Sequence, residues 1–394
     1  MIKVLFVDDE PAVLEGLENR MYRMRRQWDM RFAASGHEAL DELARGSVDV
    51  IVSDMRMPGM DGAQLLEQVR ERYPEIVRFI LSGQTGDDGA LRLMPVAHQL
   101  LTKPCDASAL ERSIERICCL RKHLLRPAVQ QALGSLRSLP ALPKLYWSLV
   151  AELQKPNSHA AAIARIIEQD VAMTARLLQM ANSVFFGPGR RISSVKDAVA
   201  LLGVEPIRSI VLSLQLVRAL GSLCVPQDFS LETLQAHSLA VGQLAASMLP
   251  PGEARHTAFS AGMLHDLGRL VMAASMPLEW AQAQQLAKDS GRTLCAAETE
   301  VLGCDHADIG AQMLCSWGLP MGLVEVVAFH HRPSLSAEDG FGPVGAVHLA
   351  NLLVAERDAG KSRDDEEYDQ IYIDRAGLAA AVAGWRRGEE VRPL

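Results

Sequence analysis

The sequence predicts a multidomain protein in which a doubly wound α/β domain is followed by an all-α domain. Near the N-terminus, apolar β-branched runs alternate with helical patterns, which is typical of a parallel sheet, here of five strands, covered by helices. Beyond residue 138 the alternation stops, and the apolar residues recur with the period of a helix. The length of 394 residues also exceeds that of one ordinary hydrophobic core.

Four apolar runs of the first domain each end in a side chain that can take part in chemistry. Because the carboxyl ends of parallel strands meet at one edge of a sheet, we expect these side chains to share one crevice. The runs lead into Asp8 and Asp9, into Asp54, into Ser82 and into Lys103. Residues 30–35 are the remaining predicted strand, and helices are predicted at residues 11–26, 37–45 and 62–72.

Asp54 ends an apolar run and is followed by a Pro-Gly pair that turns the chain. One interpretation is that Asp54 only caps the next helix. In a shared crevice, however, Asp8, Asp9 and Asp54 repel one another unless a hard cation such as Mg²⁺ lies among them. The crevice therefore suits phosphoryl transfer to Asp54 as the nucleophile, with Mg²⁺ and Lys103 neutralising the phosphoryl oxygens and Ser82 donating to one of them.

In this pattern, residues 1–118 resemble the receiver domain of two-component response regulators. The resemblance implies a phosphoacceptor aspartate, a bound Mg²⁺ ion and a sensor histidine kinase as partner. The residues that it assigns to the site are Asp8, Asp9, Asp54, the backbone carbonyl of Arg56, Ser82 and Lys103. Leu100 stands where receivers usually carry an aromatic switch residue, which puts switching through an aromatic rotamer in doubt.

A helix is predicted over residues 107–126, and Pro127 should break or kink it. We assign residues 119–138 to a helical linker. Because this helix is both the last of the first domain and its exit, it is the expected mechanical link to the second. Its exposed side is basic, which indicates either a solvated face or an interaction surface.

Residues 139–350 are predicted to form the all-α domain, with helices at 193–202 and 206–220 among others. They resemble the HDOD output domain of bacterial regulators. The motifs that carry the resemblance are the double-proline opening Leu139–Pro143, Ala181–Ser183, the segment 192–203, and Trp317–Pro320 ahead of His330 and His331. This family resembles metal-dependent HD phosphohydrolases but mostly lacks established catalysis.

Several histidines of the second domain have a spacing that could bring them together on one metal ion. The candidate ligands are His237, His265, Asp266, His306, His330 and Asn351. Asn351 stands where hydrolytic HD enzymes place a final Asp ligand, and as a neutral group it weakens the hold on a cation. Three interpretations stay open: a hydrogen-bonded polar core, a bound but non-hydrolytic metal, and an active hydrolase.

Composition limits the remaining choices. The formal charge of −8 argues against a large basic surface for DNA, and no apolar run reaches membrane-spanning length. Seven cysteines without a CxxC pair are typical of reduced thiols, and the N-terminus lacks the features of a signal peptide, so we expect a cytoplasmic protein. Residues 351–394 are predicted to be a charged loop followed by one helix at 371–385.

Two functions follow. The first is a response regulator of phosphorelay signal transduction, in which phosphorylation of Asp54 switches a non-catalytic HDOD domain that acts on an unidentified partner protein or on a second copy of the chain. The alternative is a phosphorylation-controlled, metal-dependent phosphohydrolase of cyclic dinucleotides or nucleotides. The sequence Arg332-Pro333 after the histidine pair disfavours cyclic-dinucleotide hydrolysis, because that branch of HD proteins carries Gly-Tyr-Pro there.

Overall fold

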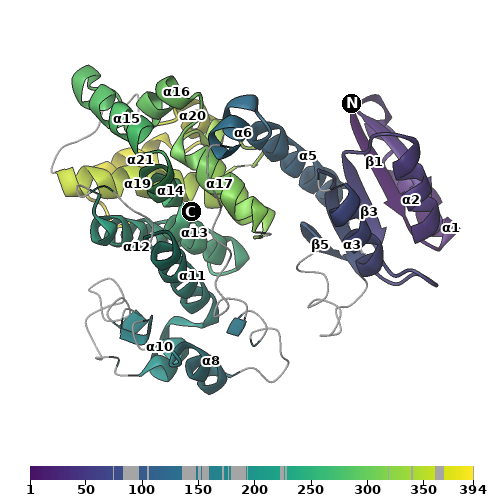
Figure 1. Cartoon of the computed structure of the whole chain (residues 1–394), viewed down its shortest axis with the longest axis horizontal. Helices are drawn as coiled ribbons and strands as arrows, with labels where there is room; N and C mark the ends of the chain where they lie inside the picture. Colours follow the sequence, from purple (N-terminus) through teal and green to yellow (C-terminus); the bar gives the residue numbers. More distant parts are fainter. Residues whose placement is uncertain are drawn as a thin grey trace. The chain divides into compact units, whose positions relative to one another are not determined.

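A computed structural model of the chain is drawn in Figure 1. It describes residues 1–73, 75–82, 97–103, 106–134, 148–149, 152, 159–170, 173–175, 177–178, 192, 194–221, 226, 229–317, 319–338, 340–359 and 368–393. The predicted opening Leu139–Pro143 and the motif Ala181–Ser183 lie outside the described residues. The chain divides into two compact units, residues 1–122 with 318–321, and residues 123–317 with 322–394.

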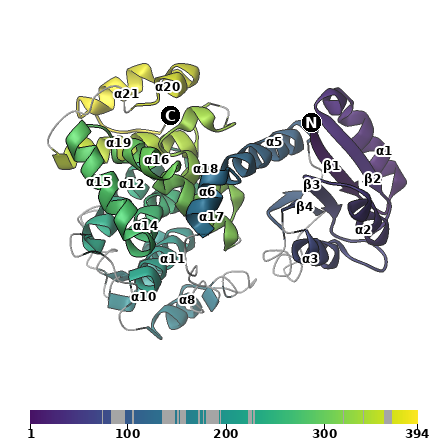
Figure 2. The same cartoon turned by 45° about the horizontal axis from the view of Figure 1, so that its top comes forward.

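The first unit contains a parallel five-stranded sheet in the order β2-β1-β3-β4-β5 (Figure 2). Its strands are β1 (Ile2–Val7), β2 (Trp28–Ala33), β3 (Val50–Asp54), β4 (Val77–Ser82) and β5 (Gln99–Thr102). Every residue of β3 is buried, because this strand lies between β1 and β4. The strand order is the doubly wound one in which ligands bind at the carboxyl edge of the sheet.

Among the described residues of this unit, the α-helices are α1 (Pro11–Arg20), α2 (Gly36–Arg45), α3 (Gly62–Arg72) and α5 (Ala107–Leu124). The single helix predicted over residues 11–26 is wrong, because α1 ends at Arg20 and a 3₁₀ helix, η1 (Tyr22–Arg26), follows. Met21 and Met24 are both buried, and the three-residue period of a 3₁₀ helix places them on one side. As predicted, α5 ends before Pro127, which opens α6 (Pro127–Gly134).

The second unit is helical in its described part. Its helices are α6, α8 (Ala160–Ile167), α10 (Val195–Leu202), α11 (Val204–Gly221), α12 (Leu231–Ser247), α13 (Glu253–Leu264), α14 (Leu267–Ser275), α15 (Pro277–Ser290), α16 (Leu294–Leu302), α17 (His306–Ser316), α18 (Met321–Phe329), η3 (Pro333–Leu335), α19 (Pro343–Ala359), α20 (Gln370–Ala376) and α21 (Ala379–Arg386). Within the part of the chain that the structure describes, no helix combines the length and apolar character needed to cross a membrane.

The predictions for two segments of this unit had different outcomes. The helices predicted at 193–202 and 206–220 correspond to α10 and α11. The single helix predicted at 371–385 is wrong, because α20 ends at Ala376 and α21 begins at Ala379. Gly377, which caps α20, has a left-handed φ of 68°. The signal for this break, an isolated glycine, was present in the sequence.

Two close helix crossings position the histidine-bearing ends of the helices. A Cβ on Gly262 of α13 would collide with the backbone of Gly242 in α12, and a Cβ on Gly268 of α14 would overlap the carbonyl oxygen of His306 in α17. Glycine is needed at both crossings because it lets two backbones approach closely. The crossings bring the α13–α14 junction next to α12 and to the first residue of α17.

Candidate functional site

Three predicted residues of the first unit meet at the carboxyl edge of its sheet. Asp8 follows β1, Asp54 ends β3 and Lys103 follows β5. The Lys103 Nζ atom lies 2.8 Å from Asp8 Oδ2 and 2.5 Å from Asp54 Oδ1. Burial alone would lower the pKa of Lys103, but the hydrogen bonds and charges of Asp54 and Asp8 outweigh it and raise this pKa. The ammonium therefore lies between two carboxylates.

Asp54 does not cap the helix that follows it. Helix α3 is capped by Asp61, which forms a capping box with Gln64. The Asp54 carboxylate instead accepts a 2.6 Å hydrogen bond from the backbone N–H of Arg56, and its residue is only 9% exposed. The capping interpretation of Asp54 is therefore wrong.

The rest of the predicted phosphoacceptor set is partly placed. Asp9 directly follows Asp8, whose carboxylate accepts from the backbone N–H of Glu10 at 3.0 Å. Ser82 ends β4 and pairs with β5, but its side chain and that of Leu100 lie outside the described residues. Adjacent carboxylate oxygens are the donors that Mg²⁺ prefers, so the residues present fit this ion.

All of the predicted histidine-site residues of the second unit come together. Among the described residues, two groups have potential ligand atoms within 4.8 Å of one another. The first group is His237, His265 and Asp266, and the second is His306, His330 and His331. Asn351 of α19 joins the first group, because its Oδ1 lies 2.9 Å from His237 Nε2.

Asp266 is buried between two positively charged side chains, Arg269 and His306. Its carboxylate lies 2.9 Å from Arg269 Nη1 and 3.1 Å from His306 Nε2. Burial alone would raise the pKa of Asp266, but Arg269, His265 and His306 hold it well below its usual range. The carboxylate is therefore ionised and lies within ion-pair distance of two cations, although neither of its oxygens has a hydrogen-bond partner among the described residues.

His306 bridges two buried carboxylates. Its Nδ1 lies 2.6 Å from Glu298 Oε2, and its Nε2 faces Asp266. Burial alone would lower the pKa of His306, but the charges and hydrogen bonds of Glu298 and Asp266 outweigh burial and raise it to about 9. The imidazole is therefore a cation at neutral pH.

His265 and His330 have the opposite character. Each donates its Nδ1–H to a backbone carbonyl, of Gly262 at 2.7 Å and of Val327 at 2.8 Å, which leaves the lone pair on Nε2. Burial lowers the pKa of both, that of His265 to about 4. Both Nε2 atoms are buried without a hydrogen-bond partner among the described residues. These donor atoms fit a transition metal, whereas the charges of Arg269 and His306 oppose one.

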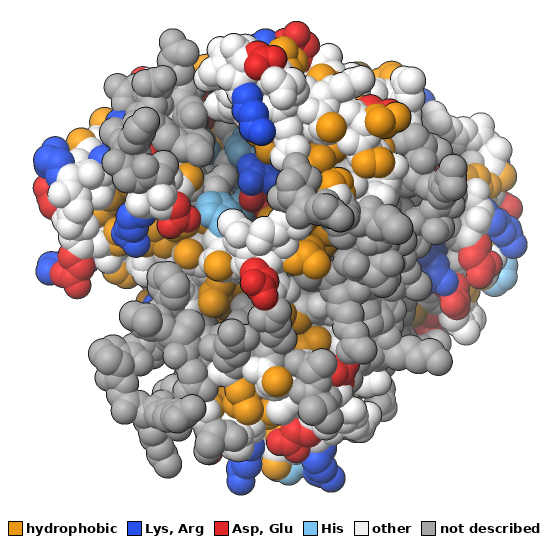
Figure 3. Space-filling model, turned by 60° about the vertical axis from the view of Figure 1, so that its left-hand side comes forward, with side chains coloured by type: hydrophobic (Ala, Val, Ile, Leu, Met, Phe, Trp, Pro, Cys, Tyr) orange, Lys and Arg blue, Asp and Glu red, His pale blue; other side chains and the backbone are white. Residues whose placement is uncertain are grey.

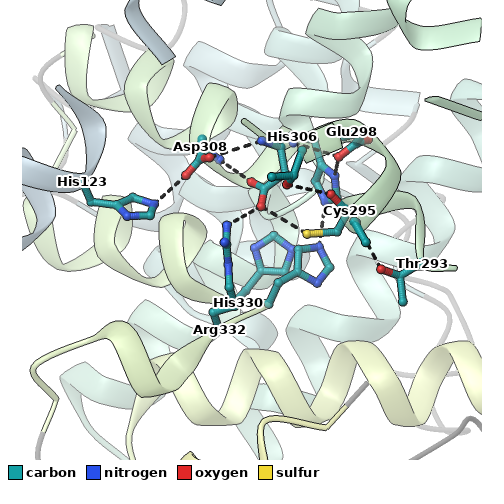
Figure 4. Close-up of polar contacts among 12 residues, drawn as sticks. His123, Thr293, Cys295, Glu298, His306, Asp308, His330 and Arg332 are labelled. Atoms are coloured by element: carbon teal, nitrogen blue, oxygen red, sulfur yellow. Dashed lines mark hydrogen bonds and ion pairs between the residues drawn. The ribbon is translucent and has the colours of Figure 1, made fainter. Parts of the chain in front are cut away.

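Figure 4 shows a polar network that continues from this cluster to the end of α5. The Asp308 carboxylate, which is buried, lies 2.6 Å from His123 Nε2 and 2.6 Å from Arg126 Nη2. Asp308 also shares a reciprocal capping box with Asp305, the N-cap of α17. Asp305 in turn lies 2.6 Å from Arg332 Nη2. The first turn of α17 therefore connects the end of α5 with the histidine cluster.

Sequence reasoning missed most of this network. The missed residues are His123, Arg126, Arg269, Glu298, Asp305 and Asp308. The spacing of Asp305 and Asp308 was a readable capping signal. Nothing in the sequence distinguished His123 and Arg126, because their partner Asp308 is 185 and 182 positions away along the chain. Arg269, three positions after Asp266, could have been read as an i,i+3 pair.

Comparison with known proteins agrees with both halves of the description. The model of the response regulator receiver domain matches residues 4–115, and that of the HDOD domain matches residues 139–333. The chain therefore contains an N-terminal response regulator receiver domain. A C-terminal HDOD domain follows it.

Individual relatives cover the chain to different extents. An uncharacterised protein of Treponema pallidum is 23% identical over 84% of this chain and 66% of its own length. The uncharacterised transcriptional regulatory protein YesN of Bacillus subtilis is 30% identical over 45% of this chain and 51% of its own length. The hydrogenase transcriptional regulatory protein HoxA of Cupriavidus necator is 39% identical over 26% of this chain and 21% of its own length. The chain thus spans less than two thirds of each.

Solved structures share the helical fold. An HDOD domain protein of unknown function from Geobacter sulfurreducens has a TM-score of 0.50, covering 69% of this chain and 97% of its own, at 22% identity. A putative phosphohydrolase from Shewanella amazonensis has a TM-score of 0.51, covering 67% and 94%, at 23% identity. At these identities the likeness establishes the fold alone.

Proposed function

We propose that Asp54 accepts a phosphoryl group from a sensor histidine kinase, and that this switches an HDOD domain acting by binding rather than by hydrolysis. The observation that carries the first half is the position of Lys103 between Asp8 and Asp54. An ammonium placed there can neutralise phosphoryl oxygens as they approach Asp54. Asp8, Asp9 and Asp54 would hold Mg²⁺, which when bound supplies further positive charge to the same oxygens.

In the transfer step, a carboxylate oxygen of Asp54 attacks the phosphorus and forms an acyl phosphate, while the bond from phosphorus to the donor breaks. The electron pair of that bond leaves with the donor group. The N–H of Arg56, which already donates to Asp54 Oδ2, keeps the carboxylate oriented. Lys103, 2.5 Å from Asp54 Oδ1, stays close to the charge that arrives.

The test is labelling of the full chain with acetyl phosphate in the presence of Mg²⁺. We expect the wild type to be labelled and Asp54→Ala to remain unlabelled. Asp41→Ala is the matched control, because Asp41 is an exposed carboxylate of α2 in the same unit and should label normally. Labelling of Asp54→Ala at the wild-type level would disprove the assignment.

The second half of the proposal rests on the charge balance around Asp266. Asp266 is the only acidic residue among the six candidate metal ligands, and it already faces the guanidinium of Arg269 and the imidazolium of His306. Asn351 gives the set no negative charge and its Oδ1 is in contact with His237. Turnover of a nucleotide or cyclic dinucleotide by the wild type, lost in Asp266→Ala, would contradict a binding role.

For the route between the halves, the anchoring of α5 is the main support. His123 and Arg126, at or just past the end of this helix, contact Asp308 of α17, so a displacement of α5 can alter the first turn of α17 beside the histidine cluster. Two-state couplings of this kind are about 1–3 kcal/mol. Hydrogen exchange of α5 and α17, with and without the phosphate mimic beryllofluoride, should differ in the wild type and not in Asp54→Asn. Equal exchange in both states of the wild type would remove this route.

A second candidate function, metal-dependent hydrolysis, is favoured by one observation. The buried Nε2 atoms of His265 and His330 have no hydrogen-bond partner among the described residues, and neutral imidazoles of this kind are metal ligands. Metal analysis of the purified protein separates the two. A stoichiometric divalent metal that His265→Ala removes, together with nucleotide turnover, would establish the hydrolase.

A further inference from the structure

A cavity of about 1040 Å³ opens beside the histidine cluster in the second unit. Its walls come from α12, α14, α15, α16 and α19, together with the residues that follow α18. Figure 3 shows histidine side chains in a recess of the surface, with Lys or Arg side chains beside them. The lining residues that matter here are Phe229, Arg269, Trp280, Arg292, Cys295 and Arg332.

The arginines of the cavity are accessible, whereas the carboxylates that balance two of them are buried. The side chains of Arg269, Arg292 and Arg332 are 28%, 51% and 38% exposed. Asp266 and Asp305, the partners of Arg269 and Arg332, are 0% exposed. Asp305 does not line the cavity, and Asp266, which does, is 0% exposed, so a molecule that enters meets mainly the guanidinium groups. Asp358 is a second carboxylate that lines it.

Arg292 can change partners at little cost. Its ion pair with Glu300 lies at the surface, where both side chains are about half exposed, and such pairs contribute little stability. A guanidinium offers five N–H donors in a planar fork that matches a phosphate group. Arg292 is therefore free to hold an anion with small loss elsewhere.

The first turn of α16 lies on the same wall. Thr293, Cys295 and Ala296 line the cavity, and Thr293 is the N-cap of this nine-residue helix. The start of a helix carries partial positive charge and backbone N–H groups without intrahelical partners. This charge adds to that of Arg292, which is two positions before the helix begins.

The part of the cavity beside α15 is apolar. Trp280 and Phe229 line the cavity with ring centroids 5.8 Å apart in an edge-to-face arrangement, and Leu234 and Leu352 lie along the same lining. Aromatic and aliphatic walls of this kind bind flat apolar rings. The cavity thus joins an apolar wall to a group of accessible arginines.

We propose that this cavity binds a phosphate monoester that carries a planar ring, of the nucleoside monophosphate class, as an effector. The phosphate is held by Arg292 and Arg332 at the start of α16, and the ring packs beside Trp280 and Phe229. The ligand is bound and released unchanged, because Asp266 is already ion-paired with Arg269 at 2.9 Å. This inference goes beyond the proposed phosphotransfer and holds whether or not Asp54 is phosphorylated.

The test is calorimetric titration of the full chain with AMP and GMP, each compared with its nucleoside and with inorganic phosphate. We expect at least one nucleotide to bind at least about tenfold more tightly than its nucleoside and than phosphate, since both halves of the ligand contribute. Arg292→Ala should weaken that binding about tenfold or more. Arg387→Ala, which removes another exposed arginine paired with a glutamate, should not change it.

Clear outcomes would overturn the proposal. These are the absence of nucleotide binding in the millimolar range, equal affinity of Arg292→Ala and wild type, or affinity for phosphate equal to that for the nucleotide. Release of nucleoside from the bound nucleotide, lost in Asp266→Ala, would make the ligand a substrate and also overturn it. Asp54→Asn should bind as the wild type does, so a failure of the phosphotransfer proposal is distinguishable from a failure here. Phe229→Leu, a milder change at the aromatic side of the cavity, should lower the affinity for the nucleotide without lowering the affinity for inorganic phosphate.

Discussion

Replacing His123 and Arg126 by alanine should loosen the attachment of α5 to α17. Asp308 is buried and receives one contact of 2.6 Å from each of these side chains. A hydrogen bond to a charged group contributes about 1.5–3 kcal/mol when it is shielded from water. Removing both side chains leaves a buried carboxylate without these two partners, which is more destabilising than replacing the whole pair.

The size of each effect follows from exposure. The Arg126 side chain is 36% exposed and screened by water, so Arg126→Ala should cost about 1 kcal/mol. The His123 side chain is 11% exposed, and its loss should cost about 2 kcal/mol. The double variant should cost about 4 kcal/mol, more than the sum, because each single variant leaves Asp308 one of these two side-chain partners.

The assay is native-state hydrogen exchange of the full chain, which reports the free energy of opening for the amides of α17. Arg112→Ala is the matched control, since Arg112 is an exposed arginine of the same helix and its loss should change stability by less than about 0.5 kcal/mol. If the double variant protected α17 as well as the wild type does, Asp308 would not anchor α5. The proposed route between the two units would then fail with it.

Two further perturbations test the packing and the electrostatics. Gly268→Ala should destabilise the second unit by several kcal/mol, because the added methyl group overpacks the crossing of α14 and α17. Gly322→Ala is the control: a Cβ there meets nothing within 4 Å, and the change should stabilise the unit by about 0.5–1 kcal/mol. A similar change in the urea midpoint for both variants would contradict the close crossing. Burial and the nearby Arg78 and Arg121 lower the pKa of His98 from 6.5 to about 3. The neutral imidazole therefore adds stability that is fully present above pH 6.5 and is lost as the pH falls toward 3, by at most about 1.4 kcal/mol per pH unit. His98→Asn keeps an acceptor for the N–H of Arg78 but cannot titrate, so its unfolding free energy should fall less steeply than that of the wild type over this window, and parallel curves would disprove the assignment.

The receiver site could be predicted because its chemistry lies at strand ends. A parallel sheet fixes where those ends meet, so Asp8, Asp54 and Lys103 could be placed together from the order of the strands alone. Here local pattern and global topology agree.

The helical unit was predictable in kind and less so in detail. The histidines could be grouped by their spacing, but their charge states could not, because these depend on partners such as Glu298 that no local pattern marks. Asp266 differs in this respect, because Arg269 stands three positions further along and an i,i+3 pair could have been predicted. The charge balance in a helical core depends on which helices pack against one another, and the hydrophobic periodicity of a single helix does not predict that packing.

The first turn of α17 also ties the cavity to α5, with a consequence that can be measured. Asp305 faces Arg332, a lining residue of the cavity, and Asp308, one helical turn further on, holds the end of α5. A nucleotide phosphate that draws Arg332 away from Asp305 changes the charge at the capping box on which both residues depend. Since coupling between two sites is reciprocal, breaking the α5 contact must then change nucleotide affinity by the factor by which the nucleotide changes that contact. We therefore expect Arg126→Ala to shift the affinity for AMP or GMP while Arg112→Ala does not, and identical titrations of the two variants would show that the cavity and α5 act independently.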